Sequence, residues 1–494
     1  MIKIENLIKI YERSFIENWD LPALTEYTTG ETLTYGDLAR DIARIHLLYR
    51  SIGIRAGDKI ALCGRDSAAW VKVFMATITY GAVIVPILSD FNPVDITHIV
   101  NHSEAVLLFA SEGVWEHIEP SALLKVKGVV SLESKEVLFE AAGVEMQRDM
   151  RLLKRRFNRR YPNGYEASDL SYPDRDNSEL AEINYTSGTT GFSKGVMLTG
   201  ENLAGNVCFG RHTVLHFRSS RALAFLPLAH AYGCAFDMLT PLAVGSHITL
   251  LCKTPSPRVL LKALSEVRPN LVVCVPLILE KIYKNQILPM ISKGTMRWTL
   301  AVPFLDSLIY SKIRKKLIDA FGGNFEEVIV GGAPLNHEVE EFLYRIKFPF
   351  TVGYGMTECG PLISYSPWRN FVPGSSGKVL PIMEARIESS DPANVPGEIC
   401  VRGVNVMKGY FKNPEAHGAG AVVRRLALHR RHGHPRRQRS ALPARTLQDD
   451  DPLRIRPEYL SGGDRGQAQQ HAFRGGESRG GARRTPRGAR LSRL

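Results

Sequence analysis

Hydrophobic and polar residues alternate with two different periods along the first 130 residues of the chain. Over residues 38–53, LARDIARIHLLYRSIG, apolar positions recur every three or four residues, which predicts a helix that ends at Gly53. The short apolar runs DKIALCG (58–64) and VIVPIL (83–88) predict buried strands, and the helical period returns between them, over residues 69–82. Such alternation is typical of parallel sheets with crossover helices, so the pattern predicts a layered α/β fold.

A later stretch departs from this pattern. Residues 150–176 are polar, rich in arginine and without apolar periodicity, so we expect a surface connection there. We interpret its basic residues as a face exposed to solvent, and contact with lipid head groups is the alternative. These residues are Lys154, Arg155, Arg156, Arg159 and Arg160. Strand and helix patterns resume at Glu182 and continue to about Tyr410.

The net charge of the chain, +13, comes almost entirely from its last 78 residues. Residues 417–494, called the tail below, contain 18 Arg, 6 Asp or Glu and no Lys, a net charge of +12, which leaves about +1 for residues 1–416. The basic composition therefore says little about the partners of the remaining chain. The tail also lacks arginine–glycine repeats interleaved with aromatic residues, so we expect no nucleic-acid partner and keep a nucleic-acid-binding tail only as an alternative.

A chain of 494 residues with 44% hydrophobic and 23% charged residues is typical of a globular protein with two or more domains. Its seven cysteines are scattered and form no C-x-x-C pair, which favours reduced thiols. The start, MIKIENLIKIYERSF, has no signal-peptide core, and no apolar run approaches the roughly 20 residues of a membrane span. We therefore expect a cytoplasmic protein and leave peripheral membrane contact and the oligomeric state open.

One segment indicates phosphate chemistry. Residues 185–198, YTSGTTGFSKGVML, follow a predicted strand, AEINY, and place six consecutive Thr, Ser or Gly residues ahead of Lys194. Small residues let the backbone approach an anion, their N–H groups and hydroxyls can surround phosphate oxygens, and the lysine adds a full charge. The segment does not fit the P-loop pattern G-x-x-x-x-G-K-[ST], because Ser193 stands where that pattern has Gly.

This segment resembles the phosphate-loop signature of the adenylate-forming enzymes, a family that includes acyl-CoA synthetases, luciferases and peptide-synthetase adenylation domains. Further segments resemble motifs of the same family in the same order: LPLAHAYG (226–233), GGAPL (331–335), GYGMTE (353–358), GEICVRG (397–403) and GYFKNP (409–414). The resemblance covers residues from about 30 to 416. It implies that residues 1–416 form the large multi-layered α/β body of such an enzyme, with parallel-rich sheets, crossover helices and two layered sheet subdomains.

The resemblance also implies roles for individual residues. The catalytic residues would be Thr186, Lys194, His230, Thr357 and Glu358. Among these, His230 would lie near the carboxylate site, Thr357 would contact the α-phosphate and Glu358 would help to hold Mg²⁺. The GGAPL turn would lie beside the adenine, on which the Tyr354 ring would stack. The full nucleotide-binding set would be Thr186, Ser187, Gly188, Thr189, Thr190, Gly191, Lys194, Gly332, Ala333, Pro334, Gly353, Tyr354, Gly355, Met356 and Thr357.

The implied cofactors are ATP and Mg²⁺, with coenzyme A as co-substrate. A carboxylate that attacks the α-phosphate of ATP brings two anions together, and Mg²⁺ on Glu358 and the ammonium of Lys194 would screen this repulsion. Because the motifs at 185–198 and 226–233 look most like the long-chain fatty acid branch, we expect such an acid to be converted to an acyl-adenylate and then to acyl-CoA. An aryl acid as substrate, or a carrier protein as acceptor, is the alternative.

The tail does not resemble any part of this family. The family has a C-terminal cap domain with a lysine that acts in adenylation, and a Thr-Gly-Asp triplet that holds the ribose, and the tail shows neither. Burial of its 13 large apolar residues would contribute about 20–40 kcal/mol, against roughly 100 kcal/mol for ordering 78 residues, so we expect it to be mostly disordered. The alternative function is therefore a truncated remnant that binds ATP and acid without efficient thioester formation.

A shifted reading frame would explain the abrupt change near Ala416. Codons exist for Asp464–Gln470 that give I-E-A-K-L-N-N when read one base later, and the same shift extended back to Arg456 permits G-Q-N-I-Y-P-E-E. Over residues 424–432 it permits D-G-W, two further residues and T-G-D-M. These strings resemble the cap motif and the ribose-binding triplet of the family. We therefore interpret the tail as the hinge and cap domain in the wrong frame, after one base was lost or gained.

Overall fold

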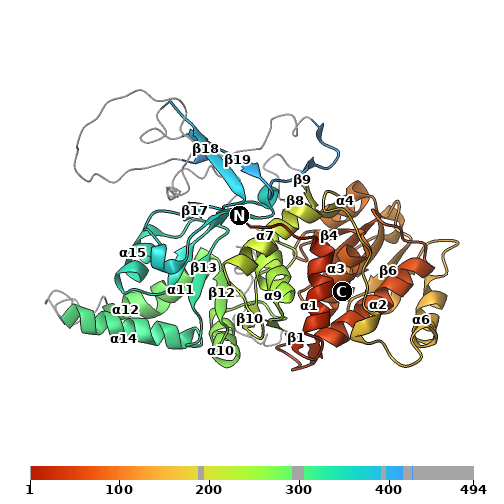
Figure 1. Cartoon of the computed structure of the whole chain (residues 1–494), viewed down its shortest axis with the longest axis horizontal. Helices are drawn as coiled ribbons and strands as arrows, with labels where there is room; N and C mark the ends of the chain where they lie inside the picture. The colour runs from red at the N-terminus through yellow and green to blue at the C-terminus, as the bar shows by residue number, and fades with distance from the viewer. Residues whose placement is uncertain (1, 187–193, 292–304, 391–396, 415–424, 427–494) are drawn as a thin grey trace, which may run out of the picture.

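The largest sheet of the protein has eight strands and is built mainly from the first part of the chain (Figure 1). The computed structural model describes residues 2–186, 194–291, 305–390, 397–414 and 425–426. In spatial order the strands are β20 (Gly409–Tyr410), β9 (Lys194–Thr199), β8 (Leu180–Thr186), β4 (Val83–Ile87), β3 (Lys59–Cys63), β5 (Ala105–Ala110), β6 (Gly128–Ser131) and β7 (Val137–Glu140). The strands from β8 to β6 run parallel, and β20, β9 and β7 pair antiparallel at the two edges.

The elements predicted for residues 38–88 are confirmed. The first predicted helix, α2 (Tyr35–Ser51), begins with a capping box: Thr34 Oγ1 accepts from the N–H of Asp37 at 3.1 Å, and the Asp37 carboxylate accepts from the N–H of Thr34 at 3.0 Å. The second, α3 (Ala68–Tyr80), ends at Gly81, whose φ of 84° is the left-handed conformation that favours glycine. The predicted strands are β3 and β4, which lie side by side in parallel.

Four smaller sheets complete the described part of the chain. Two of them are built on parallel pairs, and the other two are short antiparallel ladders between strands near in sequence; the expected division into two layered sheet subdomains stays a prediction. The four sheets are β10 (Arg221–Ala224), β11 (His247–Leu250), β1 (Pro22–Glu26) and β2 (Thr32–Thr34); β12 (Leu271–Cys274), β13 (Glu327–Val330) and β14 (Phe350–Val352); β15 (Tyr354–Gly355), β16 (Leu362–Tyr365) and β17 (Lys378–Val379); and β18 (Met383–Glu388), β19 (Gly397–Gly403) and β21 (Arg425–Leu426).

Helices cover these sheets and connect their strands (Figure 1). Besides α2 and α3, the α-helices of the described residues are α1 (Leu7–Glu17), α4 (Pro93–Ser103), α5 (Glu112–Trp115), α6 (Met146–Arg160), α7 (Gly200–His212), α8 (Ala231–Gly233), α9 (Thr240–Val244), α10 (Pro257–Val267), α11 (Pro276–Ile282), α12 (Leu288–Ile291), α14 (Leu305–Ala320) and α15 (His337–Arg345). Two π-helical segments, η3 (Cys234–Leu239) and η4 (Tyr283–Ile287), continue α8 and α11. Short 3₁₀ turns are η1 (Pro120–Ala122), η2 (Ala167–Asp169), η5 (Thr357–Cys359) and η6 (Trp368–Asn370).

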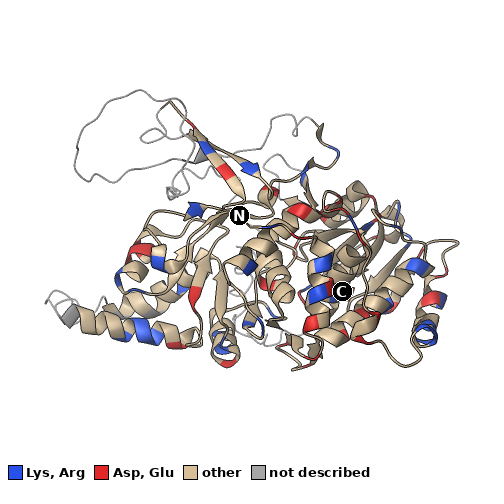
Figure 2. Cartoon of the chain, viewed as in Figure 1, with Lys and Arg blue, Asp and Glu red and all other residues tan. Residues whose placement is uncertain are grey.

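The prediction of a surface connection over residues 150–176 is wrong at its start, because α6 continues to Arg160. Its apolar face is narrow, which is why the periodicity was not recognisable: Met146 and Phe157 are its only buried residues. The Phe157 ring packs 5.1 Å from that of Tyr161, and the guanidinium of Arg44 lies 4.8 Å above it. The basic residues of α6 are exposed, as expected, and appear at one end of the molecule in Figure 2.

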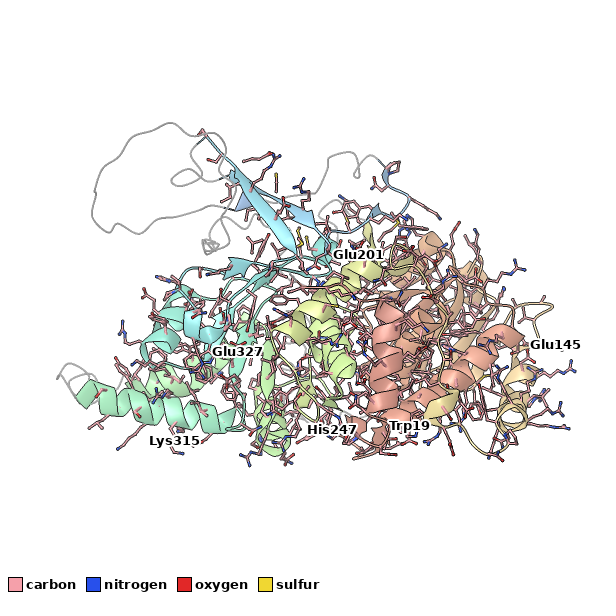
Figure 3. The ribbon with its side chains drawn as sticks, viewed as in Figure 1. Trp19, Glu145, Glu201, His247, Lys315 and Glu327 are labelled. Carbon is pink, nitrogen blue, oxygen red and sulfur yellow. The ribbon has the colours of Figure 1, made fainter. Side chains whose placement is uncertain are left out.

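Side chains fill the space between the layers, and the molecule is elongated (Figure 3). Glu145, beside α6, and Lys315, on α14, lie near its opposite ends. All seven cysteines are free, in agreement with the expectation of reduced thiols. Within the described ranges, no helix is both long enough and apolar enough to cross a membrane. The predicted disorder of the tail falls on residues that, except for β21, lie outside the described ones.

Candidate active site

The predicted phosphate loop joins two paired strands. β8 and β9 run antiparallel, with Tyr185 opposite Gly195 and Thr186 opposite Lys194, so the last pair stands at the base of the loop. Gly195 has to be small, since a Cβ atom there would lie 2.9 Å from Cγ2 of Ile183 and 3.1 Å from the Tyr185 ring. The remaining predicted residues of the loop lie outside the described ones; they are Ser187, Gly188, Thr189, Thr190 and Gly191.

Lys194 and Glu358 come from motifs far apart in the sequence and meet at Tyr410. The Tyr410 hydroxyl donates a hydrogen bond to Glu358 Oε1 at 2.8 Å, and Lys194 Nζ lies 5.3 Å from the centroid of the Tyr410 ring. The backbone carbonyl of Glu358 accepts from the N–H of Met407 at 2.8 Å, and only 9% of Glu358 is exposed. The two charged groups therefore lie on the same side of the fold. Tyr410 belongs to the GYFKNP segment and was not among the predicted site residues.

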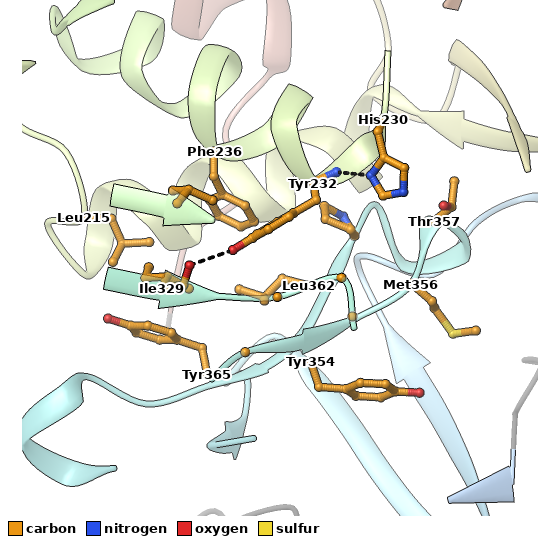
Figure 4. A pocket seen from close by; sticks show the side chains of 16 residues that line it. Leu215, His230, Tyr232, Phe236, Ile329, Tyr354, Met356, Thr357, Leu362 and Tyr365 are labelled. Atoms are coloured by element: carbon orange, nitrogen blue, oxygen red, sulfur yellow. Dashed lines mark hydrogen bonds between the residues drawn. The ribbon is translucent and has the colours of Figure 1, made fainter. Parts of the chain in front are cut away.

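His230 stands at the start of α8 and lines a pocket. Its Nδ1 accepts from the backbone N–H of Tyr232 at 3.2 Å (Figure 4). Burial lowers the pKa of His230 to about 4, so the imidazole is neutral at pH 7. Because Nδ1 is the acceptor, the ring proton resides on Nε2, which can donate a hydrogen bond to a carboxylate.

The backbone of the LPLAHAYG turn is held by buried side chains that the sequence did not single out. Asp66 Oδ1 accepts from the N–H of Leu228 at 3.1 Å, and Asn184 Nδ2 donates to the carbonyl of Ala229 at 3.2 Å. Asp237, only 2% exposed, accepts from the backbone of residues 225 and 226. Burial raises the pKa of Asp66 to about 7 and that of Asp237 well above its usual range. The only hint in the sequence was an acidic residue within the apolar run 231–244.

A pocket with about 560 Å³ of empty space lies between this turn and the GYGMTE segment. Among the described residues that line it, His230 alone carries an ionisable nitrogen, and none carries a carboxylate. One end is formed by His230 and predicted nucleotide-binding residues, namely Gly332, Gly353, Tyr354, Gly355, Met356 and Thr357. The other end is apolar and is formed by Leu215, Phe236, Val273, Ile329, Leu362 and Tyr365 (Figure 4).

Tyr232 lies between these two ends. Its hydroxyl donates to the backbone carbonyl of Ile329 at 3.1 Å, and its ring packs against Gly331, where a Cβ atom would lie 2.9 Å from Tyr232 Cζ (Figure 4). A glycine is therefore required where the GGAPL turn passes the ring. The other predicted residues of this turn, Ala333 and Pro334, are half-buried and do not line the pocket.

Glu358 fits the role of a magnesium ligand by the chemistry of its surroundings. Within the described ranges, no three His, Cys, Asp or Glu residues gather as a metal site, so the protein offers no closed cage there. Mg²⁺ bound with a nucleotide needs only one or two carboxylates, since phosphates and water complete its octahedral shell. Glu358 supplies one carboxylate, and its partner Tyr410 lies on β20 next to β9, so this donor set is compatible with such a shared ion.

The chain is similar in sequence to a known enzyme family and to several curated proteins. A family described as AMP-binding enzyme matches residues 12–411. The peroxisomal long chain acyl-CoA synthetase 6 of Arabidopsis thaliana is 30% identical over 419 residues, covering 77% of this chain and 57% of the relative. A long-chain-fatty-acid–CoA ligase of Mycobacterium bovis is 28% identical over 422 residues, covering 78% of this chain and 64% of the relative. The chain thus spans about three fifths of the length of these curated relatives.

Solved structures show the same fold. The N-terminal domain of FACL13 from Mycobacterium tuberculosis matches with a TM-score of 0.64 and 18% identity, covering 84% of this chain and 93% of that domain. An anthranilate CoA ligase in complex with anthranoyl-AMP matches with a TM-score of 0.65 and 18% identity, covering 84% of this chain and 72% of the ligase. The predicted α/β body with parallel-containing sheets is confirmed by these matches.

Proposed function

The chain belongs to the AMP-binding enzyme family, and on that premise we propose that it activates a carboxylic acid with ATP. The acid, for which we favour a long-chain fatty acid, would form an acyl-adenylate and then a thioester with coenzyme A. The observation that carries this proposal is the pocket between His230 and Thr357, which has a nucleotide-binding motif at one end and apolar walls at the other. The similar long-chain acyl-CoA synthetases of known function support the choice of acid.

The charged residues would act at the phosphate end. Lys194 would bind the phosphates, and Thr357 would donate its hydroxyl to the α-phosphate from the rim of the pocket. Glu358 would hold Mg²⁺, which supplies charge neutralisation when it is bound. Donors that are already in place when charge develops at phosphorus are typically worth about a hundred- to a thousandfold in rate each. Pyrophosphate is the leaving group, so no protein nucleophile is needed.

His230 would orient the acid. A carboxylate in the pocket is an acceptor, and the neutral His230 ring presents an N–H donor to it at Nε2. Because the ring is uncharged, it forms no ion pair that would lower the nucleophilicity of the attacking oxygen. The hydrocarbon chain would then extend past Tyr232 to the apolar end, where Leu215, Phe236 and Val273 offer no partner for a charged substrate. An amino acid or a dicarboxylate would have to bury its second charge there unpaired.

We further propose that residues 1–416 are the adenylate-forming body and that the tail replaces the hinge and cap domain. A second candidate function follows from this: the chain binds ATP and acid but forms little thioester. The specific observation in its favour is that residues 417–494 contain no lysine, whereas the cap of the family contributes one to adenylation. Coenzyme A turnover and nucleotide binding should therefore be measured separately.

ATP–pyrophosphate exchange with a panel of acids tests the proposed reaction. The expected order places palmitate and similar acids ahead of octanoate, and all of these ahead of acetate, benzoate and amino acids. A preference for benzoate would contradict the choice of acid and favour the aryl-acid alternative. Absence of exchange, together with binding of ATP and acid, would support the second candidate function.

A further inference from the structure

Tyr410 lies between the two charged residues of the phosphate end. Its strand, β20, pairs antiparallel with β9, and Tyr410 is opposite Val196, two positions from Lys194. The side chain is 8% exposed, its hydroxyl donates to Glu358 Oε1 at 2.8 Å, and its ring faces Lys194 Nζ at 5.3 Å. One side chain thus contacts the proposed metal ligand through its hydroxyl and the proposed phosphate ligand through its ring.

We propose that Tyr410 is a positioning residue that presents Glu358 to Mg²⁺ and Lys194 to the nucleotide phosphates. This inference rests on the proposed function, because it assigns Tyr410 a part in the binding of the same nucleotide. The backbone that leads to Tyr410 is itself held by side-chain hydrogen bonds. Asn202 Nδ2 donates to the carbonyl groups of Val404 and Val406 at 2.7 and 2.9 Å, which holds the segment that leads into β20.

The hydroxyl acts on Glu358. A carboxylate has two oxygens, and a donor on Oε1 fixes the rotation of the group while it leaves Oε2 to face a cation. Among the described residues, Oε2 of Glu358 receives no hydrogen bond and no ion pair. Hydrogen bonds to metal-binding carboxylates orient them, and the loss of such a partner typically lowers metal affinity about 10- to 100-fold.

The ring acts on Lys194. An aromatic face attracts an ammonium group without neutralising its charge, whereas a carboxylate partner would compete with the phosphates. In the described part of the chain, Lys194 and Glu358 form no ion pair with each other, and each of them contacts Tyr410 instead. The same tyrosine therefore keeps both charges available, the lysine for phosphate and the glutamate for the cation.

Two substitutions separate these effects. Tyr410→Phe removes the hydroxyl and keeps the ring, so it should act only on Glu358; Tyr410→Leu removes both. The matched control is Tyr35→Phe, because the Tyr35 hydroxyl is also buried and donates to the carbonyl of Ser246 at 2.7 Å, between α2 and the residue before β11. This control measures how far the loss of a buried tyrosine hydroxyl lowers stability and nucleotide affinity when the site itself is unchanged.

The experiment is a titration of the purified 494-residue protein with a fluorescent ATP analogue, once with Mg²⁺ and once with EDTA. We expect Tyr410→Phe to leave the affinity in EDTA unchanged. The ratio of the affinity with Mg²⁺ to the affinity in EDTA should fall about tenfold or more. Tyr410→Leu should in addition weaken binding in EDTA, and Tyr35→Phe should match the wild type in both titrations. Thermal melting of all four proteins checks that they are folded at the temperature of the titration.

An affinity ratio for Tyr410→Phe equal to that of the wild type would overturn this inference while leaving the proposed function intact. Equal reductions of the ratio in Tyr410→Phe and Tyr35→Phe would also overturn it, since the effect would then follow from lost stability. If the wild type itself bound no ATP analogue, the proposed function would fail, and the role of Tyr410 with it.

Discussion

The side-chain amide of Asn184 donates a hydrogen bond to the backbone carbonyl of Ala229 at 3.2 Å. Asn184 lies on β8, two residues before Thr186, and Ala229 directly precedes His230. This buried contact joins the strand that enters the predicted phosphate loop to the turn that carries the histidine. The phosphate end and the acid end of the proposed site are therefore fixed relative to each other by a side chain outside every motif.

Substitution of Asn184 by Ala should lower the free energy of unfolding by about 1–3 kcal/mol, because the carbonyl of Ala229 would lose its buried donor. The Glu182 carboxyl, which accepts from Asn184 Nδ2 at 2.7 Å, would lose its donor as well. Urea unfolding measures the loss, and binding of the acid should weaken in parallel. As a control, Asn101→Ala removes a similar bond, to the carbonyl of Ala122 at 2.8 Å, outside the site and should leave acid binding unchanged. Unaltered acid binding in Asn184→Ala would show that the contact is structural only.

Substitution of Glu358 or Thr186 by Ala should impair adenylation far more than folding. Each change removes a group proposed to act on the phosphates or on Mg²⁺, so we expect exchange activity to fall about a hundred- to a thousandfold. The melting temperature should change little by comparison, and Glu201→Ala, an exposed residue in the first turn of α7, serves as the control. Loss of activity in proportion to loss of thermal stability would assign both residues a structural role instead.

The stability of the protein should depend on pH through Glu182. Burial raises the pKa of this carboxyl from 4.5 to about 7, although the Asn184 amide acts in the opposite direction. The folded protein keeps the proton up to about pH 7 and the unfolded chain loses it near 4.5, so this group destabilises the fold progressively as the pH rises between these values. Glu182→Gln removes this dependence.

Unfolding free energies at several pH values test this directly. The stability of Glu182→Gln relative to the wild type should increase by about 3 kcal/mol from pH 4.5 to pH 7, which corresponds to the shift in pKa. Glu201→Gln, at an exposed position, provides the comparison. Parallel pH curves for the wild type and Glu182→Gln would mean that Glu182 is ionised in the folded protein.

The nucleotide sequence around codon 416 tests the interpretation of the tail. We expect codons that, read one base later, give a Thr-Gly-Asp triplet from residues 424–432 and G-Q-N-I-Y-P-E-E before I-E-A-K from residues 456–467. Restoring that frame should then yield a chain with higher thioester-forming activity than the 494-residue protein. Codons that give neither motif, or efficient thioester formation by the 494-residue chain, would contradict the idea.

Much of the fold could be predicted because it depends on local patterns. The apolar period over residues 38–53 with its stop at Gly53, and the helical period over residues 69–82, mark α2 and α3 without knowledge of the rest of the chain. α6 was not predicted as a helix because only two of its residues are buried. Most of its other residues are polar or charged, which is also typical of surface segments that are not helical.

The site could be predicted only where motifs mark it. His230, Thr357 and Glu358 were recognised by their neighbours in sequence. Tyr410 lies in the GYFKNP segment, yet the resemblance assigned it no role, and Asn184 lies outside the motifs. Their contacts with Glu358 and Ala229 join residues 52 and 45 positions apart in sequence, so no local pattern marks them. Contacts of this kind follow from how the strands are ordered in the sheet, which the sequence does not show directly.

The central claim, that one pocket holds both an acyl chain and an adenylate, is tested most directly by calorimetric titration with a hydrolysis-resistant palmitoyl-adenylate analogue. This measurement requires no turnover and therefore does not depend on the cap domain. We predict one equivalent bound, more tightly than ATP or palmitate alone, because the joined ligand fills both ends of the pocket at once. Absence of binding, or tighter binding of the benzoyl or aminoacyl analogue, would contradict the account.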